Sequence, residues 1–283
     1  MKLRNSILST STKIFLLGTS FFITACRTVP TKAVQEKTIC ISYHELRSQQ
    51  NMLATNWYQT AGEAKALYIQ GYNIAKERLL KHLKTPSKKP YSIVLDLDET
   101  VIDNSPYSAE NILQGRAYEP STWDEWVKKM EAKAVPGAKE FLEFADKNKV
   151  EIYYISDRTE EQLDATIMNL EKIGIPVQGR DHVLLKSAQD KSGKVNRREY
   201  VKNRTNLIML FGDNLSDFDE FSKKSVEARN RKVEELAEEF GSRFILFPNP
   251  MYGAFESAIY KGTFGDAEKQ IQYRKEALQP YLK

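Results

Sequence analysis

The sequence contains few of the residues that build disulfide-rich or zinc-binding proteins. Of its 283 residues, two are cysteine (Cys26 and Cys40) and three are histidine. So few cysteines exclude a disulfide scaffold, a four-cysteine zinc site and a CxxC redox motif. The histidines also lie too far apart for an HxxxH-type ligand pair. Any bound metal ion therefore needs oxygen ligands.

The sequence also lacks a long hydrophobic run and a strong excess of one charge. No segment approaches the roughly 18 consecutive apolar residues of a membrane span. The formal net charge is +4, but Lys2, Arg4 and Lys13 supply three of these charges, so the chain after residue 25 carries +1. Duplex nucleic acid is disfavoured as a partner because it requires clustered lysines and arginines. With 41% hydrophobic residues, the chain can form one large globular domain with additions.

The first 26 residues are typical of an export signal. A basic start is followed by a short apolar run, Ile14–Ile23, which suits a signal-peptide core and cannot cross about 30 Å of hydrocarbon. The run ends in Ile-Thr-Ala-Cys, which resembles a bacterial lipobox. We expect residues 1–25 to be a lipoprotein signal peptide, Cys26 to be lipidated and residues 26–41 to form its tether. An ordinary signal peptide followed by a chance cysteine is the alternative.

Residues 42–89 are expected to be helical. Apolar residues recur there every three to four positions, which predicts a helical pair or one long helix. Pro86 and Pro90 then stop the pattern, and we place a domain boundary at residues 85–90. The segment would belong to a smaller helical subdomain, and residues 251–283 would form a C-terminal helical segment.

Between these segments, β-branched and aromatic runs alternate with amphipathic stretches. The strands are predicted at 92–97, 150–155, 206–211 and 243–247, and the helices at 137–148, 160–173, 217–240 and 266–278. This βαβ rhythm predicts an α/β core over residues 90–250, a Rossmann-like doubly wound parallel sheet with helices on both faces. Residues 103–135 form an insertion, or cap, longer than a crossover needs.

Acidic residues follow three of the predicted strands. Asp96 and Asp98 end the first strand, Asp157 the second and Asp213 the third, and Asp217 opens the next helix. Each acid alone is equally typical of a helix cap or turn. Together they indicate a site, because ligands bind beyond the carboxyl ends of parallel strands.

Carboxylates at such short range repel one another unless a cation compensates them. Oxygen ligands that leave room for water and phosphate favour Mg²⁺ over Zn²⁺. A calcium-binding EF-hand starting at Asp96 is excluded, because its sixth position is Val101 instead of glycine and its twelfth is Tyr107 instead of glutamate.

Four ordered motifs carry a family resemblance. DLDET at 96–100, YYISDR at 153–158, Lys186 in HVLLK and GDNLSD at 212–217 resemble those of the haloacid-dehalogenase-like phosphatases. Three further segments narrow the resemblance to the lipoprotein class C acid phosphatase and 5′-nucleotidase family of bacterial envelopes. They are the lipobox, ILQGRAYEPSTWDEW and PNPMYGAFE at 248–256. The resemblance covers residues 42 to about 265. In this superfamily, dehalogenases lack the second aspartate and the metal, so Asp98 with Thr100 implies a phosphatase.

The chemistry of phosphoryl transfer gives these residues expected roles. Asp96 would be the nucleophile that forms an aspartyl-phosphate, and Asp98, two residues along an extended segment, the acid and base. The expected Mg²⁺ ligands are Asp96, the Asp98 carbonyl and Asp213, with Asn214 and Asp217 in support.

Phosphate binding is assigned to a second group of residues. These are Thr100, Ser156, Arg158 and Lys186, the last of which would otherwise be an ordinary surface lysine. Asp157 departs from the asparagine that the resemblance implies before Arg158, and its role stays open.

The substrates are expected to be small phosphate monoesters. Trp123, Trp126 and Tyr252 are candidates to stack on a flat leaving group, which makes nucleotides plausible substrates, although packing of the insertion explains the tryptophans equally well. The resulting hypothesis is a Mg²⁺-dependent acid phosphatase that includes 5′-nucleotidase activity. A phosphotransferase to acceptor hydroxyls and a ligand-binding or adhesin lipoprotein on the same scaffold are the alternatives.

The protein is expected to be lipid-anchored in the cell envelope with its catalytic domain outside the cytoplasm. The outer membrane is favoured in a Gram-negative cell, because Arg27 is not the aspartate that resembles an inner-membrane retention signal. The sequence leaves open the oligomeric state, a dimer included, and the role of Cys40.

Overall fold

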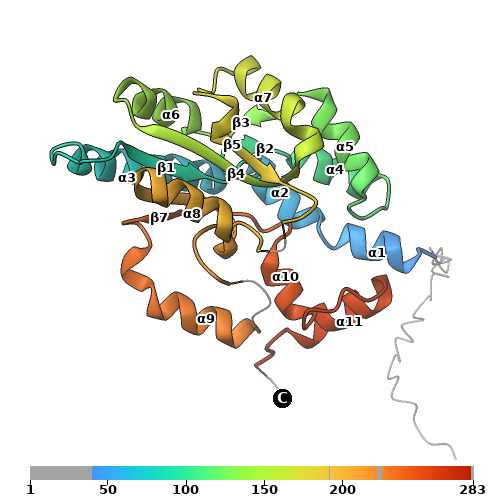
Figure 1. Ribbon diagram of the computed structural model, residues 1–283. Helices are drawn as coiled ribbons and strands as arrows, with labels where there is room; N and C mark the ends of the chain where they lie inside the picture. The colour runs from blue at the N-terminus through green and yellow to red at the C-terminus, as the bar shows by residue number, and fades with distance from the viewer. Residues whose placement is uncertain (1–39, 191, 222–224, 282–283) are drawn as a thin grey trace, which may run out of the picture. The chain divides into compact units, whose positions relative to one another are not determined.

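A five-stranded parallel sheet forms the centre of the structure (Figure 1). The computed structural model describes residues 40–190, 192–221 and 225–281, so residues 1–25, Cys26 and nearly all of the expected tether lie outside the described residues. The strand order is β5-β4-β1-β6-β7. The strands are β1 (Tyr91–Leu95), β4 (Glu151–Thr159), β5 (Val183–Lys186), β6 (Asn206–Gly212) and β7 (Phe244–Leu246). The predicted α/β class with a parallel sheet is confirmed.

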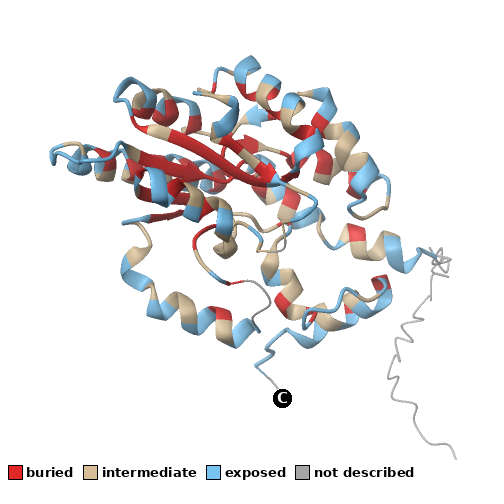
Figure 2. Ribbon diagram, viewed as in Figure 1, coloured by how far each residue is buried: buried red, intermediate tan, exposed pale blue. Residues whose placement is uncertain are grey.

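Both faces of this sheet are buried, which explains why its strands are apolar without a polar alternation. In β1, Ile93 and Leu95 belong to the larger core cluster on one face, whereas Val94 belongs to the smaller cluster on the other. Tyr154 and Tyr153 in β4 divide in the same way. Since successive strand residues point to opposite faces, helices must cover both of them. Figure 2 shows the strands buried and the outer helix surfaces exposed.

The helices follow the predicted pattern with several differences in their bounds. The amino-terminal segment contains three helices, α1 (Tyr43–Gln49), α2 (Met52–Thr60) and α3 (Gly62–His82). The other helices of the core and the carboxyl-terminal segment are α6 (Ala138–Lys147), α7 (Leu163–Lys172), α8 (Val195–Arg204), α9 (Val226–Glu235), α10 (Ala254–Ile259) and α11 (Ala267–Glu276), with short 3₁₀ turns η1 (Glu160–Gln162), η2 (Arg180–His182), η3 (Leu215–Asp217) and η4 (Ala237–Glu239).

Two of the differences have clear local causes. The helix predicted over 217–240 is shorter, because Asn214 caps the 3₁₀ turn η3 and Ser225 caps a separate start of α9 by accepting a hydrogen bond from the Ala228 amide. Strand β5 was not predicted, since its four residues are too few to show a period.

The expected domain boundary at residues 85–90 is wrong. The described residues from Ile41 onward form one compact unit, and Tyr72, Ala75 and Leu79 of α3 lie in the same core cluster as β1. The prolines end a helix, but the helix packs directly on the sheet. Helix α3 therefore belongs to the α/β core and not to a separate helical subdomain.

Helix α3 is also linked to the loop that follows β1. The hydroxyl of Tyr68 donates a hydrogen bond to the Glu99 carbonyl at 2.5 Å, and that of Tyr72 donates to the Thr100 carbonyl at 2.6 Å. Both tyrosines are buried. The amino-terminal region thus fixes the backbone of the DLDET motif.

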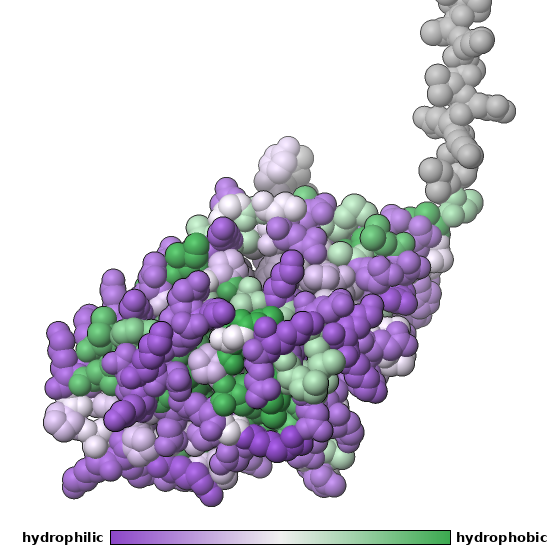
Figure 3. All heavy atoms as spheres, turned by 90° about the horizontal axis from the view of Figure 1, so that it is seen from above, coloured by the Kyte–Doolittle hydropathy of each residue, from purple (hydrophilic) through white to green (hydrophobic). Residues whose placement is uncertain are grey.

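The insertion at 103–135 has its own secondary structure. It contains α4 (Ser105–Leu113), α5 (Pro120–Lys129) and the short strand β3 (Lys133–Ala134), which pairs antiparallel with β2 (Ile102–Asp103) at the start of the insertion. Among the described residues no helix is both long and apolar enough for a membrane span. Hydrophilic side chains cover much of the face shown in Figure 3, with apolar groups between them.

The packing of α3 on β7 predicts the effect of enlarging Gly71. A Cβ atom at Gly71 would lie 2.5 Å from Cε1 of Phe247, whose buried ring stacks on Tyr68 and packs at a tilt against Tyr72. Alanine favours a helix over glycine by about 1 kcal/mol, whereas overpacking a core costs about 1–3 kcal/mol. We expect Gly71→Ala to lower Tm by about 2–4 °C in a thermal melt.

Gly62→Ala is the matched control, because nothing lies within 4 Å of a Cβ at the start of the same helix. It should leave Tm unchanged or raise it. A higher Tm for Gly71→Ala would show that Phe247 moves aside without cost.

Candidate active site

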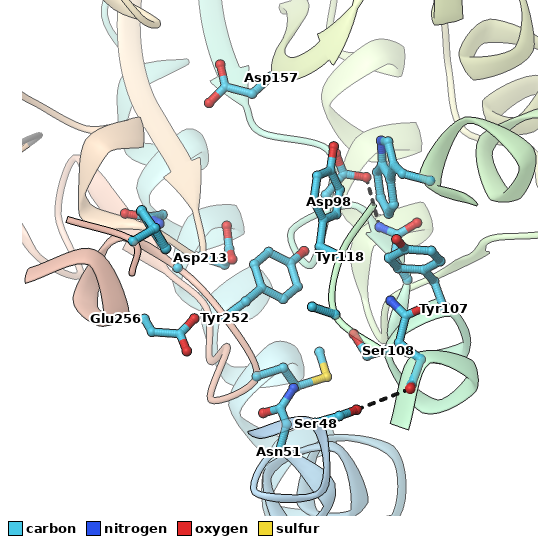
Figure 4. A pocket seen from close by; sticks show the side chains of 18 of the residues that line it. Ser48, Asn51, Asp98, Tyr107, Ser108, Tyr118, Asp157, Asp213, Tyr252 and Glu256 are labelled. Atoms are coloured by element: carbon cyan, nitrogen blue, oxygen red, sulfur yellow. Dashed lines mark hydrogen bonds between the residues drawn. The ribbon is translucent and has the colours of Figure 1, made fainter. Parts of the chain in front are cut away.

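The carboxyl ends of β1 and β6 bring three aspartates together. Asp96, Asp213 and Asp217 each present a carboxylate oxygen, and these oxygens lie within 4.8 Å of one another. All three line a cavity of about 440 Å³, of which Figure 4 gives a close view. The prediction that acids of separate strand ends meet is thus confirmed for two ends, Asp96 after β1 and Asp213 after β6, and Asp217 of the following turn joins them. Asp157, the acid that follows the second predicted strand, lines the same cavity but does not belong to this cluster.

A buried lysine lies between two of these carboxylates. Lys194, just before α8, places its Nζ 2.5 Å from Oδ1 of Asp96 and 2.6 Å from Oδ1 of Asp217. Burial by itself lowers the pKa of Lys194, but the carboxylates of Asp217 and Asp96 outweigh burial and raise it above the ordinary value. The lysine is therefore a permanent positive charge in the site.

The lysine expected here was Lys186, and the structure does not bring it to the cluster. Lys186 is exposed at the end of β5 and does not line the cavity. Strand β5 is at the edge of the sheet, and the chain returns from there to Lys194, the N-cap residue of α8, whose side chain is buried between the aspartates. The order of the motifs correctly predicted a lysine between the second and fourth motifs, but the lysine in the site is Lys194 and not Lys186.

The aspartates are held in an environment that opposes their ionisation. Burial raises the pKa of Asp96 well above its usual range, with Asp217 and Asp213 adding to the effect and Lys194 opposing it. Burial and the neighbouring Asp217 raise the pKa of Asp213 to about 7, against a hydrogen bond from Asn249. Three carboxylates facing one lysine favour a further cation.

Asp98 is oriented by a buried arginine. Its Oδ1 accepts hydrogen bonds from Arg158 Nη2 at 2.8 Å and Arg158 Nε at 3.0 Å, and its Oδ2 accepts one from the Ser156 hydroxyl at 3.1 Å. Arg158 also donates to Thr166, and Ser156 is fully buried. Both had been predicted to bind phosphate. In this structure they hold the carboxylate of Asp98 at the cavity wall.

Asn104 is a buried residue of the site that the sequence reasoning missed. Its Nδ2 donates to Asp98 Oδ1 at 2.8 Å, and its Oδ1 accepts the indole N–H of Trp126 at 2.8 Å. Trp126 does not line the cavity and packs against the core, so the predicted stacking role does not fit its position. Its contact with Asn104 instead orients the group that holds Asp98.

Strand alternation explains where Asp157 lies. Strand β4 continues through Ser156, Asp157 and Arg158, so Ser156 and Arg158 share the side that contacts Asp98, whereas Asp157 lines the cavity from the other side of the strand. Asp157 pairs with Arg197 at 3.2 Å, and Arg197 also donates to the carbonyls of Ser156 and Leu184. Arg197 lies one turn into α8 and thereby joins the ends of β4 and β5 to the helix that begins after Lys194.

Backbone geometry sets the position of Asp217. The side chains of Asn214 and Asp217 cap each other's amides in η3, and Asp213 Oδ2 accepts a hydrogen bond from Asn249 at 2.7 Å. A Cβ atom at Gly212 would lie 2.3 Å from Asp217 Oδ2, so only glycine leaves room for this carboxylate. The expected supporting roles of Asn214 and Asp217 agree with this geometry, and Asp217 also joins the carboxylate cluster directly.

The remaining predicted residues divide between the cavity and the core. Trp123 and Tyr252 line the cavity, as does Tyr118, which was not predicted. The hydroxyl of Tyr252 contacts the carboxylate of the buried Glu99. Thr100 is fully buried and does not line the cavity, so its position does not fit the predicted phosphate contact.

Comparison with known proteins agrees with this site. A family model for the haloacid-dehalogenase-like (HAD) superfamily, subfamily IIIB (acid phosphatase), matches residues 22–255. The chain belongs to this family. The resemblance inferred from the four motifs is thus confirmed, and the members of this HAD acid phosphatase family are phosphomonoesterases.

Solved structures of one relative extend the comparison. The class C acid phosphatase from Bacillus anthracis is 46% identical, with a TM-score of 0.80 over 83% of this chain and 99% of that chain. A second structure of that enzyme, with tungstate bound, is 47% identical, with a TM-score of 0.79 over 83% of this chain and 98% of that chain.

Curated relatives outside bacteria are more distant. The stem 31 kDa glycoprotein of Glycine max is 25% identical over 193 residues, which is 66% of this HAD acid phosphatase chain. The stem 28 kDa glycoprotein of the same plant is 26% identical over 166 residues, or 56% of this chain. The chain spans 62% of the length of each of these relatives.

The two lysines make opposite predictions. Lys194→Met removes the charge that faces Asp96 and Asp217, and we expect it to lower kcat for 4-nitrophenyl phosphate by about 10²–10³-fold, as for loss of one preorganised electrostatic contact. Lys186→Met should change kcat by less than about twofold, because the side chain is exposed and outside the cavity. Steady-state kinetics at saturating substrate measure both. A larger loss of kcat in Lys186→Met than in Lys194→Met would show that Lys186, and not Lys194, provides the positive charge of the site.

The pKa of Asp213 predicts how stability depends on pH. Its folded value of about 7 lies above the ordinary value of 3.8, so the folded chain holds a proton that the unfolded chain has lost. This contribution to stability is complete at low pH and is lost as the pH rises toward and through 7.

In EDTA, Tm should therefore fall by at least about 2–4 °C as the pH rises from about 5 to about 8, and a divalent cation should offset more of this loss at the higher pH. Asp213→Asn should reduce the pH dependence. A cation-induced rise in Tm that is the same at both pH values would contradict the assignment.

Proposed function

We propose that this protein is a Mg²⁺-dependent acid phosphatase that hydrolyses phosphate monoesters, nucleoside 5′-monophosphates among them, through a phosphorylated Asp96. The observation that carries the proposal is the cluster of Asp96, Asp213 and Asp217 with Lys194 inserted between two of them. Asp98, two residues from Asp96, lines the same cavity. The family membership supports the reaction class.

The donor set suits a hard divalent cation. All three side chains offer carboxylate oxygens, and one lysine leaves an excess of negative charge when all three are ionised. Oxygen donors of this kind favour Mg²⁺ over metals that prefer nitrogen or sulfur. Asp96, Asp213 and Asp217 would hold the ion, which when bound neutralises negative charge on the phosphoryl group and its carboxylates.

The first half of the reaction would use Asp96 and Asp98. A carboxylate oxygen of Asp96 attacks phosphorus and forms an acyl-phosphate, while the bond from phosphorus to the leaving oxygen breaks. Protonated Asp98 donates its proton to that leaving oxygen. Lys194 provides positive charge beside Asp96, where the transferring group gathers negative charge.

The second half would release phosphate. The carboxylate of Asp98 takes a proton from a water molecule, whose oxygen attacks phosphorus as the bond to Asp96 breaks. Inorganic phosphate leaves, and Asp96 is a carboxylate again. Arg158, Ser156 and Asn104 keep Asp98 in place through both halves, because all three bind its oxygens.

Aromatic side chains support flat leaving groups as substrates. Trp123, Tyr118 and Tyr252 line the cavity, and stacking on an aromatic ring contributes about 1–3 kcal/mol per nucleic-acid base without selecting one base. Trp123 is held edge-on by Tyr107 at a centroid distance of 5.2 Å. This supports nucleoside monophosphates as one substrate class.

We also propose that Cys26 anchors the protein to a membrane of the cell envelope, with the catalytic domain outside the cytoplasm. The support is the lipobox-like sequence after a short apolar run. Labelled palmitate should be incorporated into the full chain in cells and not into Cys26→Ser. Equal labelling of the two would contradict the anchor.

The test of the function is hydrolysis of adenosine 5′-monophosphate and 4-nitrophenyl phosphate by the full chain with Mg²⁺ and with EDTA. We expect hydrolysis with Mg²⁺ and none with EDTA. Asp96→Asn should lower kcat by at least about 10³-fold because the nucleophile is lost. Mass spectrometry of quenched reactions should detect phosphate on Asp96. Asp164→Asn, whose side chain is 76% exposed, is the matched control. An active Asp96→Asn variant would show that Asp96 is not the nucleophile.

A further inference from the structure

The cavity has a second polar end, which the proposed chemistry does not use. Figure 4 shows Ser48 and Asn51 at one end and Asp98, Asp157 and Asp213 at the other. Two cavity-lining arginines, Arg47 and Arg116, lie beside Ser48. Arg47 precedes Ser48 in α1, and the Arg116 carbonyl accepts a hydrogen bond from the Ser48 hydroxyl at 2.9 Å.

Neutral side chains hold both guanidinium groups. Arg116 Nε donates to Asn111 Oδ1 at 2.8 Å, and Arg47 Nε donates to Gln270 Oε1 at 2.8 Å. An amide oxygen fixes the plane of a guanidinium without compensating its charge. Among the described residues, no hydrogen-bond acceptor is assigned to the outer nitrogens of Arg116, and those of Arg47 have only a distant carboxylate.

That carboxylate is already paired with a third arginine. Glu256 forms an ion pair and hydrogen bond with Arg274, whereas Arg47 Nη2 is 3.8 Å from Glu256 Oε1, too far for a hydrogen bond. Glu256 is the acid that lines this end of the cavity among the described residues. At this end of the cavity, one lining carboxylate thus faces three lining arginines.

We propose that Arg47 and Arg116 form a subsite for a second phosphate group on the substrate, on the leaving-group side of the bond that is broken. This inference rests on the proposed function. The substrate's reacting phosphate would lie at Asp96, its middle beside Tyr252, and its second phosphate at the outer nitrogens of Arg116 and Arg47. Planar guanidinium groups held by Nε present paired N–H donors that match phosphate oxygens.

The substrate class is therefore one of bisphosphates, such as nucleoside 3′,5′-bisphosphates. The subsite acts on specificity, because it contacts a group that does not react. Its contribution should appear as a difference in kcat/KM between substrates with and without the second phosphate.

The test compares adenosine 3′,5′-bisphosphate with adenosine 5′-monophosphate on the full chain with Mg²⁺. The wild-type protein should prefer the bisphosphate by about tenfold in kcat/KM, beyond the factor of about two expected from its two reacting phosphates. Arg116→Gln and Arg47→Gln should each lower kcat/KM for the bisphosphate several-fold more than for the monophosphate. Lys202→Gln removes an exposed charge on α8 and should leave both values unchanged.

A second measurement needs no variant, so it tests the subsite even where the variants fold poorly. In the wild-type protein the preference should fall as salt rises from about 0.1 M to about 1 M, because screening weakens a charge-based contact at a half-exposed site. A wild-type preference of twofold or less, or equal losses for both substrates in Arg116→Gln, would overturn the subsite. If the wild-type protein did not hydrolyse 4-nitrophenyl phosphate, the proposed function would be overturned instead.

Discussion

The site depends on the electrostatic balance among buried carboxylates. Asp96, Asp213 and Asp217 place oxygens within 4.8 Å of one another in a region that burial keeps dry enough to raise two of their pKa values. Lys194 compensates one negative charge, and the others require protons or a further cation. The parallel order of β1 and β6 brings the acids together, and the residue just before α8 is the lysine. Each element therefore contributes one part of a charge balance that none achieves alone.

The acids could be predicted because strand ends are visible in a sequence. A run such as Ser92–Leu97 indicates a buried parallel strand, and the carboxyl ends of neighbouring parallel strands must meet at one edge of the sheet. Lys194 could not be found in the same way. Its position depends on how the chain returns from the edge strand β5 to α8, and this path has no period or composition that marks it.

The residues that support Asp98 show a similar division. Arg158 and Ser156 were selected from a motif, but their contacts with Asp98 follow from the continuation of β4 past the end of β1. Asn104 and Trp126 form a second layer that links the insertion to the acid. Nothing in the local sequence distinguishes an asparagine that orients a carboxylate from one that caps a turn. Such roles become visible only when the tertiary contacts are known.

The hydrogen bonds from Tyr68 and Tyr72 have a consequence for reading related sequences. Both hydroxyls bind carbonyl groups of the loop after β1, and every residue carries a carbonyl group. The side chains at positions 99 and 100 can therefore change without weakening these links, whereas the tyrosines cannot change without losing them. Pairwise covariation between the loop and α3 would then be weak, even though the helix is a physical part of the catalytic framework.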